Sequence, residues 1–142
     1  MAQGGGICQN ATMFMRTAIL FSVLAPSVVA QPLSGAEFDA YTQGKTLFYG
    51  FDGVAYGVER YLPDRRVIWS FLDGDCKQGV WYEQDGQICF VYEDRPDPQC
   101  WVFTQSGGGL VAQFEGDPEA TELYEAGDID EEMVCHGPDV GV

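Results

Sequence analysis

Carboxylates are the most abundant side chains in this sequence that could do chemistry. Two of them facing each other can hydrolyse a glycosidic bond, one as the acid and the other as the base or nucleophile. Glu59, Glu83 and Glu93 fall within predicted strands rather than in loops. Glu83 is expected at a strand end, where a carboxylate emerges into solvent, and Glu59 can pair with the arginines at 60–66. We therefore predict no catalytic residue among them.

Few residues in the sequence are suited to nucleophilic or redox catalysis. Past residue 30 the only serines are Ser34, Ser70 and Ser106, and none lies in a G-x-S-x-G motif. The only histidine, His136, stands in a glycine- and proline-containing tail, and the sequence has no C-x-x-C pair for disulfide exchange. We predict a protein that is not an enzyme and has no cofactor.

Acidic loops could bind calcium through carboxylate oxygens. The densest acidic clusters are Asp73-Gly74-Asp75 and residues 128–132. Neither matches the D-x-D-x-D-G-x5-E calcium loop, and acidic clusters are expected from the abundance of Asp and Glu alone. We predict no metal site.

Residues 1–30 have the pattern of a leader and signal peptide. Arg16 precedes an apolar run that ends at Ala30 and is shorter than the roughly 20 residues that a membrane-spanning helix needs. Cleavage after Ala30 leaves 31–142 as a single β domain with an acidic C-terminal tail. We predict a periplasmic or secreted protein whose mature chain does not insert into a membrane. The translation start stays open among three methionines, Met1, Met13 and Met15.

The charge balance limits the partners. The 142 residues include 22 Asp or Glu against 7 Lys or Arg, a net charge of −15, which becomes −16 without residues 1–30. A nucleic-acid site needs a cluster of Lys and Arg, so we exclude nucleic acid as a partner. A protein partner, which the sequence does not identify, is expected to be basic.

The elements that must position these residues are one short helix and a run of strands. Residues 34–37 (SGAE) form a capping box and Gly44 can end a helix, which predicts a helix over about 35–43. Beyond residue 45, apolar segments alternate with turn-forming dipeptides such as Asp52-Gly53. Consecutive antiparallel strands of this kind close into a barrel or fold into a sandwich. We predict seven strands and a weak eighth: 46–51, 54–61, 66–71, 78–84, 87–93, 99–105, 110–115 and 121–125.

The turns also predict which side chains share a face. A two-residue turn at Asp85-Gly86 and a four-residue turn over 94–97 place five large side chains on a common core face: Trp81, Ile88, Phe90, Trp101 and Phe103. A turn at Pro63-Asp64 places Val58 opposite Trp69, in the same core. The opposite face is also apolar and needs the helix, the C-terminal tail or a partner to cover it. Its residues are the predicted binding surface, Val80, Tyr82, Val91 and Val102.

Four cysteines follow residue 30: Cys76, Cys89, Cys100 and Cys135. An even number in an exported chain predicts two disulfides. The predicted registers make Cys89 and Cys100 diagonal neighbours about 7 Å apart, and a bulge or strand twist would bring them within bonding distance. We favour Cys89–Cys100, which leaves Cys76–Cys135 as the second pair.

Five short motifs follow the helix in order: Gly44-Lys45-Thr46, Tyr61-Leu62-Pro63-Asp64, Gly79-Val80-Trp81, Cys89-Phe90 and Cys100-Trp101. In this order they resemble a class of small exported bacterial proteins of unknown function, in which a short helix leads into a lipocalin-like meander with a G-x-W strand and spaced cysteines. The resemblance implies a small lipocalin-like barrel of seven or eight strands in the periplasm, and no particular activity.

The aromatic residues allow a second kind of site. They make up 17 of the 112 residues after Ala30, and a barrel of about eight strands either fills its lumen with side chains or holds one small ligand. A ligand cavity would be floored by Trp69, Trp81 and Trp101. We predict a non-catalytic binding module, primarily for a protein partner. The alternatives are an accessory structural subunit of an envelope or membrane complex, and a carrier of a small apolar ligand.

Overall fold

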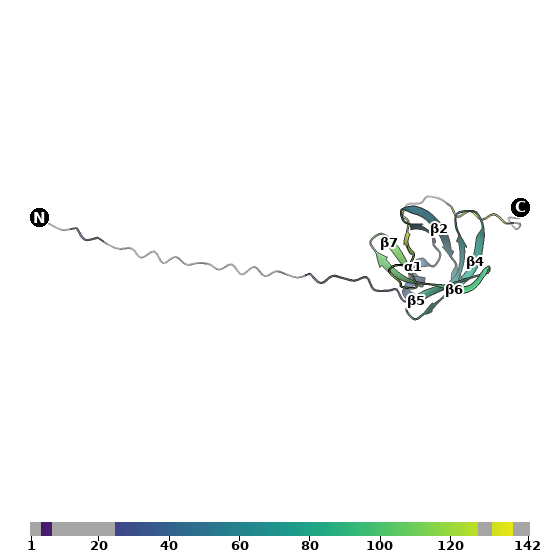
Figure 1. Cartoon of the computed structure of the whole chain (residues 1–142), viewed down its shortest axis with the longest axis horizontal. Helices are drawn as coiled ribbons and strands as arrows, with labels where there is room; N and C mark the ends of the chain where they lie inside the picture. Colours follow the sequence, from purple (N-terminus) through teal and green to yellow (C-terminus); the bar gives the residue numbers. More distant parts are fainter. Residues whose placement is uncertain (1–3, 7–24, 128–131, 138–142) are drawn as a thin grey trace.

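The computed structural model describes residues 4–6, 25–127 and 132–137. Within these residues, eight strands form one closed antiparallel barrel in which each strand pairs with its neighbours in sequence and β1 pairs with β8 (Figure 1). The strands are β1 (Thr46–Phe51), β2 (Val54–Tyr61), β3 (Arg66–Ser70), β4 (Cys76–Gln84), β5 (Gln87–Tyr92), β6 (Arg95–Ser106), β7 (Gly109–Phe114) and β8 (Glu122–Glu125). The predicted mainly β barrel with one short helix is confirmed, including its weak eighth strand, and the sandwich is excluded.

Two of the turns show why the strands begin and end where they do. Asp52-Gly53 and Asp85-Gly86 have positive φ at both residues, 48° and 80° in the first pair and 52° and 74° in the second. A two-residue hairpin needs this conformation to match the twist of its strands, and Asp-Gly adopts it at low cost. The registers predicted across Asp85-Gly86, including Trp81 opposite Phe90, are confirmed.

Helix α1 (Gly35–Thr42) closes one end of the barrel. The Ser34 hydroxyl accepts a hydrogen bond from the Glu37 backbone N–H while the Glu37 carboxylate accepts one from the Ser34 N–H, which completes the predicted capping box. Phe38 projects from this helix into the lumen and is fully buried. Its ring lies 5.0 Å from that of Trp81 and 4.6 Å from that of Phe103.

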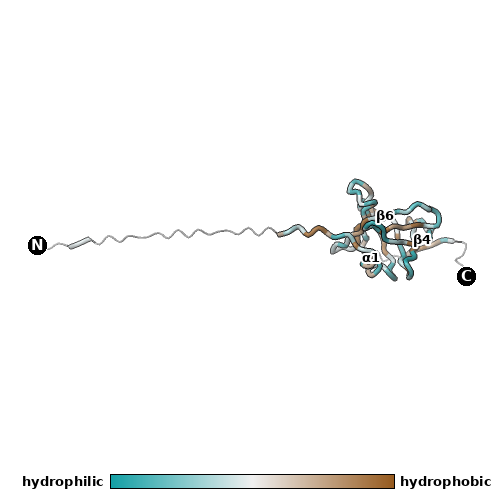
Figure 2. Tube along the Cα trace, turned by 90° about the horizontal axis from the view of Figure 1, so that it is seen from below, coloured by the Kyte–Doolittle hydropathy of each residue, from teal (hydrophilic) through white to brown (hydrophobic). Residues whose placement is uncertain are grey.

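The up-and-down topology gives the barrel two different ends. The closed end carries α1 and the hairpin loops at 62–65, 85–86 and 107–108. The open end carries the loops at 52–53, 71–75, 93–94 and 115–121. Within the barrel, the loops are largely hydrophilic and the strands contain most of the hydrophobic stretches (Figure 2). Inward-facing residues of all eight strands meet in the lumen, where the buried core contains Tyr49, Tyr61, Trp69, Trp81, Phe90 and Phe103.

The C-terminal segment packs on the outside of the barrel. Cys135 forms a disulfide with Cys76 at the start of β4, and the segment lies beside β4 (Figure 1). Met133 packs on Phe48 and Val58, the outward-facing residues of β1 and β2. The tail therefore covers the outer face of β1 and β2 rather than the predicted binding surface on β4 to β6.

The register between β2 and β3 differs from the prediction by one residue. Glu59, not Val58, lies opposite Trp69, and Val58 lies opposite Ser70. Leu62 donates a backbone hydrogen bond to the Arg66 carbonyl, which leaves three residues, Pro63 to Arg65, in the turn itself. Arg65 has a φ of 57°. Three-residue hairpins of this type add one residue to the turn, and a one-residue shift moves every side chain to the other face. Val58 is therefore outside the barrel, beneath Met133, and Glu59 is inside.

The register between β5 and β6 differs by two residues. The turn consists of Glu93 and Asp94 alone, and a bulge lies between Phe90 and Tyr92. Cys89 and Cys100 are therefore directly opposite each other and form the second disulfide, with a Cα–Cα distance of 4.0 Å. A two-residue shift keeps each side chain on its face, so the predicted core face survives. Both predicted disulfides are confirmed, although Cys89–Cys100 forms between direct neighbours rather than diagonal ones.

The predicted leader lies mostly outside the described residues, which omit 1–3 and 7–24. In the described part of the chain, no helix has both the length and the apolar character needed to cross a membrane. Hydrogen-bonded contacts between the N-terminal segment and the barrel are found just after Ala30, where Pro32 pairs with Thr104 and the Leu33 N–H donates to the Phe103 carbonyl.

Candidate functional site

A cavity of about 270 Å³ lies at the open end of the barrel. Nine of its eighteen lining residues are aromatic, and they come from β1, β2, β3, β5, β6 and the loop after β3. The aromatic residues are Tyr49, Tyr56, Tyr61, Trp69, Phe71, Phe90, Tyr92, Trp101 and Phe103. Phe90 and Phe103 also contact Phe38, so α1 supports the inner boundary of the cavity from the closed end.

Two glycines make room for two large rings of the cavity wall. A Cβ atom on Gly57 would lie 2.3 Å from the Trp69 ring, and one on Gly79 would lie 2.7 Å from the Tyr92 ring. Each ring thus comes close to the backbone of the neighbouring strand. The aromatic side chains line the wall instead of filling the lumen completely.

Glu59 is the charged residue inside this cavity. It lies on β2, is only 2% exposed, and faces inward because of the three-residue hairpin that follows the strand. The Tyr92 hydroxyl, on β5, donates a hydrogen bond to Glu59 Oε2 at 3.0 Å. Among the described residues nothing donates to Oε1.

Burial controls the protonation of this site. Loss of hydration raises the pKa of the Glu59 carboxyl well above its ordinary value, and the hydrogen bond from Tyr92 opposes that effect only in part. Burial also raises the pKa values of Tyr61 and Tyr92, and the nearby Glu59 carboxylate adds to the rise. The Tyr49 and Tyr61 hydroxyls form a hydrogen bond of 2.8 Å with each other.

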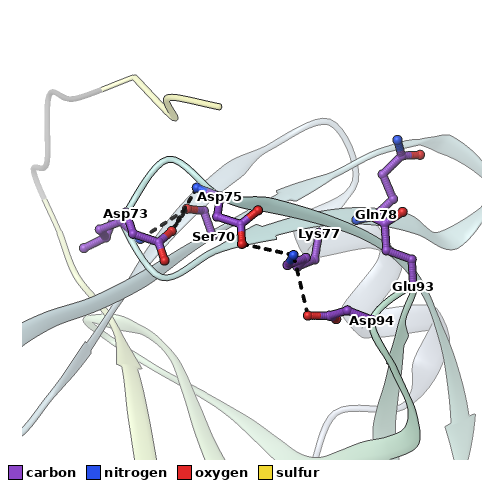
Figure 3. Close-up of polar contacts among 8 residues, drawn as sticks. Ser70, Asp73, Asp75, Lys77, Gln78, Glu93 and Asp94 are labelled. Atoms are coloured by element: carbon purple, nitrogen blue, oxygen red, sulfur yellow. Dashed lines mark hydrogen bonds and ion pairs between the residues drawn. The ribbon is translucent and has the colours of Figure 1, made fainter. Parts of the chain in front are cut away.

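Charged side chains surround the mouth of the cavity. Lys77 lies between Asp75 and Asp94, with Nζ–Oδ2 distances of 3.0 and 3.7 Å (Figure 3). The hydrogen bond that the Lys77 ammonium donates to the Asp75 carboxylate is the main cause of a raised Lys77 pKa. Asp73 and Arg95 complete the charged rim. All the carboxylates of the rim are exposed, in contrast to Glu59.

Apolar side chains also protrude at the open end. We call Phe51, Val54, Phe71 and Leu72 the apolar lip; each is at least 40% exposed. The lip joins the cavity through Tyr56, whose ring lies 6.1 Å from that of Phe51 and 5.7 Å from that of Phe71. The apolar lip and the charged rim therefore both border the mouth of the cavity.

The three predicted cavity tryptophans occupy different places. Trp69 and Trp101 line the cavity, and Trp101 also packs at 5.0 Å on Phe114. Trp81 does not line it and instead packs between Phe38 and the Arg65 guanidinium at the closed end. Inward-facing residues near opposite ends of a barrel line different parts of the lumen, and a role of Trp81 in ligand binding stays a prediction.

The predicted binding surface lies on the outer face of β4 to β6. Val80 is 48% exposed, and Tyr82, Val91 and Val102 are partly buried. These four side chains share a face, but only Val80 among them is an exposed large hydrophobic residue. Their role as a docking surface stays a prediction.

The three glutamates examined for acid–base chemistry do not meet. Glu83 accepts a hydrogen bond from the Gly35 N–H at the closed end, and Glu93 accepts one from the Gln78 N–H at the β5–β6 turn. Among the residues that the structure describes, Glu59 pairs with no arginine, contrary to expectation, because it faces the lumen. Its position within a predicted strand, beside Arg60, was the available sequence signal, and the wrong turn length hid the fact that Glu59 faces inward.

The described residues contain no group of three or more His, Cys, Asp or Glu side chains arranged to hold a metal ion. Of the two acidic clusters, residues 128–131 lie outside the described part of the chain. In the other cluster, an Asp73 carboxylate oxygen accepts hydrogen bonds from the Asp75 N–H and the Ser70 hydroxyl, which shapes the loop (Figure 3).

Comparison of the chain with protein-family models, curated proteins and solved structures finds no match. The interpretation of the site therefore depends on its own geometry.

Proposed function

We propose that this protein is an exported, non-catalytic barrel that binds one small, largely apolar ligand in the cavity at its open end. The observation that carries the proposal is the cavity of about 270 Å³, half of whose lining residues are aromatic. Ligand sites are usually concave and mostly apolar, with a few polar groups that orient the ligand. Glu59 and the tyrosine hydroxyls supply such groups here.

The size of the cavity limits the ligand. Pockets for drug-sized molecules measure about 300–1,000 Å³, and this cavity lies just below that range. We expect a molecule with about one aromatic ring and a short side chain. Among the functions considered from the sequence, this geometry favours the small-ligand carrier over the protein-binding module and the structural subunit.

The binding can be tested with 2-phenylethanol, a neutral molecule of suitable size. In proton–nitrogen NMR spectra of the purified protein, the indole N–H resonances of Trp69 and Trp101 are expected to shift on titration, because both rings line the cavity. Trp81 packs at the closed end and provides an internal reference in the same spectrum. Absence of any shift at Trp69 and Trp101 would contradict the proposal.

Filling the cavity provides the matching variant. Ala112 lines it and is 1% exposed, so Ala112→Phe should occupy ligand space and weaken 2-phenylethanol binding at least tenfold, or about 1.4 kcal/mol. The milder Ala112→Leu should have a smaller effect. Ala40→Phe makes the same change at an exposed position of α1 and should leave binding unchanged. Equal binding by all these variants would place the ligand elsewhere.

We also propose that the chain reaches an oxidising compartment and is cleaved after Ala30. Two disulfides support this, because such bonds persist mainly in the periplasm or outside the cell. Amino-terminal sequencing of the protein recovered from the periplasm of a bacterial host is expected to begin at Gln31. A mature protein that still carries residues 17–30 would refute the cleavage.

A further inference from the structure

We propose that the cavity is selective for a small organic ammonium ion, whose positive group contacts the Glu59 carboxylate and whose apolar body contacts the aromatic wall. This inference rests on the proposed function, because it names the class of ligand for the same cavity. Three features of the cavity support it: the unpartnered oxygen of Glu59, the aromatic wall and the charges at the mouth.

Only one of the two Glu59 carboxylate oxygens has a hydrogen-bond partner among the described residues. Oε2 accepts a hydrogen bond from Tyr92, whereas Oε1 is buried and receives none. Buried polar atoms are nearly always paired, and an unpaired one is costly. Because Glu59 lines the cavity, the missing donor can come from a molecule inside it. An ammonium group donates that hydrogen bond and also supplies the positive charge that a buried carboxylate needs as its partner.

The second feature is the aromatic wall around the carboxylate. Trp69 lies opposite Glu59 in the β2–β3 register, and the Tyr49 and Tyr56 rings lie 6.5 and 6.0 Å from the Trp69 ring. The faces of tryptophan and tyrosine rings attract cations, most strongly where water is excluded. Several such rings and one carboxylate form a better site for a cation with an apolar body than for a neutral or anionic molecule.

The third feature is the charge at the mouth. The rim carries three aspartates against Lys77 and Arg95, and two of those aspartates are engaged with Lys77. The whole chain is strongly acidic, at −15. This field concentrates small cations near the mouth and repels anions. An anionic ligand would also have to place its charge in a lumen that already contains Glu59.

Binding of the ammonium ion is expected to release a proton. Burial raises the pKa of Glu59, so its carboxyl keeps a proton to higher pH in the empty cavity. An alkylammonium ion entering the site forms an ion pair with the carboxylate as that proton leaves to solvent, and charge is conserved. Affinity for the cation should therefore rise as the pH increases above 4.5, the ordinary pKa of a glutamate, for as long as the alkylammonium keeps its charge.

The other ionisable groups around the cavity are those of its wall and mouth. They are Tyr49, Tyr56, Tyr61 and Tyr92 in the wall, and Asp73, Asp75, Lys77, Asp94 and Arg95 at the mouth. Burial raises the pKa values of Tyr49, Tyr61 and Tyr92, so these three stay neutral in this range. The comparison of wild type with a Glu59 variant separates the contribution of Glu59 to the pH dependence of cation affinity from the contribution of the charged groups at the mouth.

The test uses three probes with the same phenyl ring and two-carbon spacer: 2-phenylethylamine, 2-phenylethanol and 3-phenylpropanoate. Their dissociation constants are measured by NMR titration at pH 8, with the indole signals of Trp69 and Trp101. The amine is expected to bind at least tenfold more tightly than the alcohol, as one charge-assisted hydrogen bond predicts. The anion should bind more weakly than both.

Glu59→Gln keeps the shape of the side chain and removes its charge. It should abolish the preference for the amine, bringing the amine and the alcohol within about threefold of each other, while affinity for the alcohol stays nearly unchanged. Glu122→Gln removes the same charge from an exposed position of β8 outside the cavity and should keep the preference. Calorimetry of the wild type in two buffers should detect the released proton, a measurement that needs no variant.

The outcomes separate this inference from the proposed function. If the alcohol or the anion binds as tightly as the amine, or if Glu59→Gln keeps the preference, the ammonium selectivity is wrong and a cavity for small ligands still stands. If none of the three probes shifts the Trp69 and Trp101 signals, both proposals fail.

Discussion

At the scale of single residues, Glu59 is the least expected feature of this barrel. Glutamate is seldom buried unless it is paired, and most of the lumen around this one is aromatic. A side chain with one satisfied oxygen and one unsatisfied oxygen destabilises the empty barrel. Residues of this kind with perturbed pKa values gather at functional sites, which is the reason to examine Glu59 first.

The burial of Glu59 predicts a pH-dependent stability. Its folded pKa is raised, so its contribution to the free energy of unfolding is full below about pH 4.5 and is lost as pH rises toward the folded pKa. Glu59→Gln cannot titrate, and its free energy of unfolding relative to wild type should therefore increase from pH 4 to pH 8. Urea unfolding of both proteins across this range measures the difference.

A control is needed because many exposed carboxylates also titrate below pH 8. Glu122→Gln changes the net charge by the same amount from an exposed position. Its unfolding curves should follow those of wild type at each pH. Parallel behaviour of Glu59→Gln and wild type would mean that the Glu59 carboxyl is not protonated in the folded barrel.

At the scale of elements, α1 contributes chiefly through one side chain. The helix has eight residues, too few to be stable alone in water, so it is held by contacts with the barrel. Phe38 contacts the rings of Tyr61, Trp81, Phe90 and Phe103. This one residue therefore seals the closed end and supports the inner boundary of the cavity.

Removal of that ring tests the role of α1. Phe38→Ala should lower the free energy of unfolding by about 3–5 kcal/mol, because it leaves a cavity among four aromatic rings. Phe51→Ala, in the apolar lip, removes a ring that is 40% exposed and should cost about 1 kcal/mol or less. Urea unfolding at neutral pH compares the two variants. Similar losses would show that α1 is not the seal of the barrel.

At the scale of the whole molecule, the closed barrel and the two disulfides complement each other. Barrel closure removes the exposed strand edges that promote aggregation. Cys89–Cys100 links adjacent strands over 11 residues, whereas Cys76–Cys135 joins the C-terminal segment to β4 over 59 residues. The longer connection restricts the unfolded chain more strongly.

The double variant Cys76→Ser, Cys135→Ser tests this restriction. Loss of the crosslink should lower the free energy of unfolding by about 4 kcal/mol in the chain-entropy model, compared with about 3 kcal/mol for loss of Cys89–Cys100. Release of Met133 from Phe48 and Val58 would add to the first loss. Urea unfolding under oxidising conditions measures both, and a larger effect from the shorter crosslink would contradict the expected order.

Local chemistry in the sequence determined the number of elements and most of their limits, although β4 and β6 begin earlier than predicted, at Cys76 and Arg95. Asp52-Gly53 and Asp85-Gly86 form two-residue hairpins because those residues accept positive φ, and the Ser34–Glu37 capping box starts α1 where expected. The facing strands favoured Cys89–Cys100, and the even cysteine count left Cys76–Cys135 by elimination. Apart from Cys76–Cys135, each of these features depends on residues that are close in sequence or on strands joined by a short turn.

Tertiary structure alone decided what lies inside the open end. A single extra residue in the Pro63–Arg65 loop changes which side of β2 faces the lumen, and that residue count depends on backbone angles that the sequence permits but does not require. The same change moved Glu59 inward and Val58 beneath Met133. The cavity, in turn, depends on how far rings from six elements fill one lumen, a property of their joint packing and of no single segment.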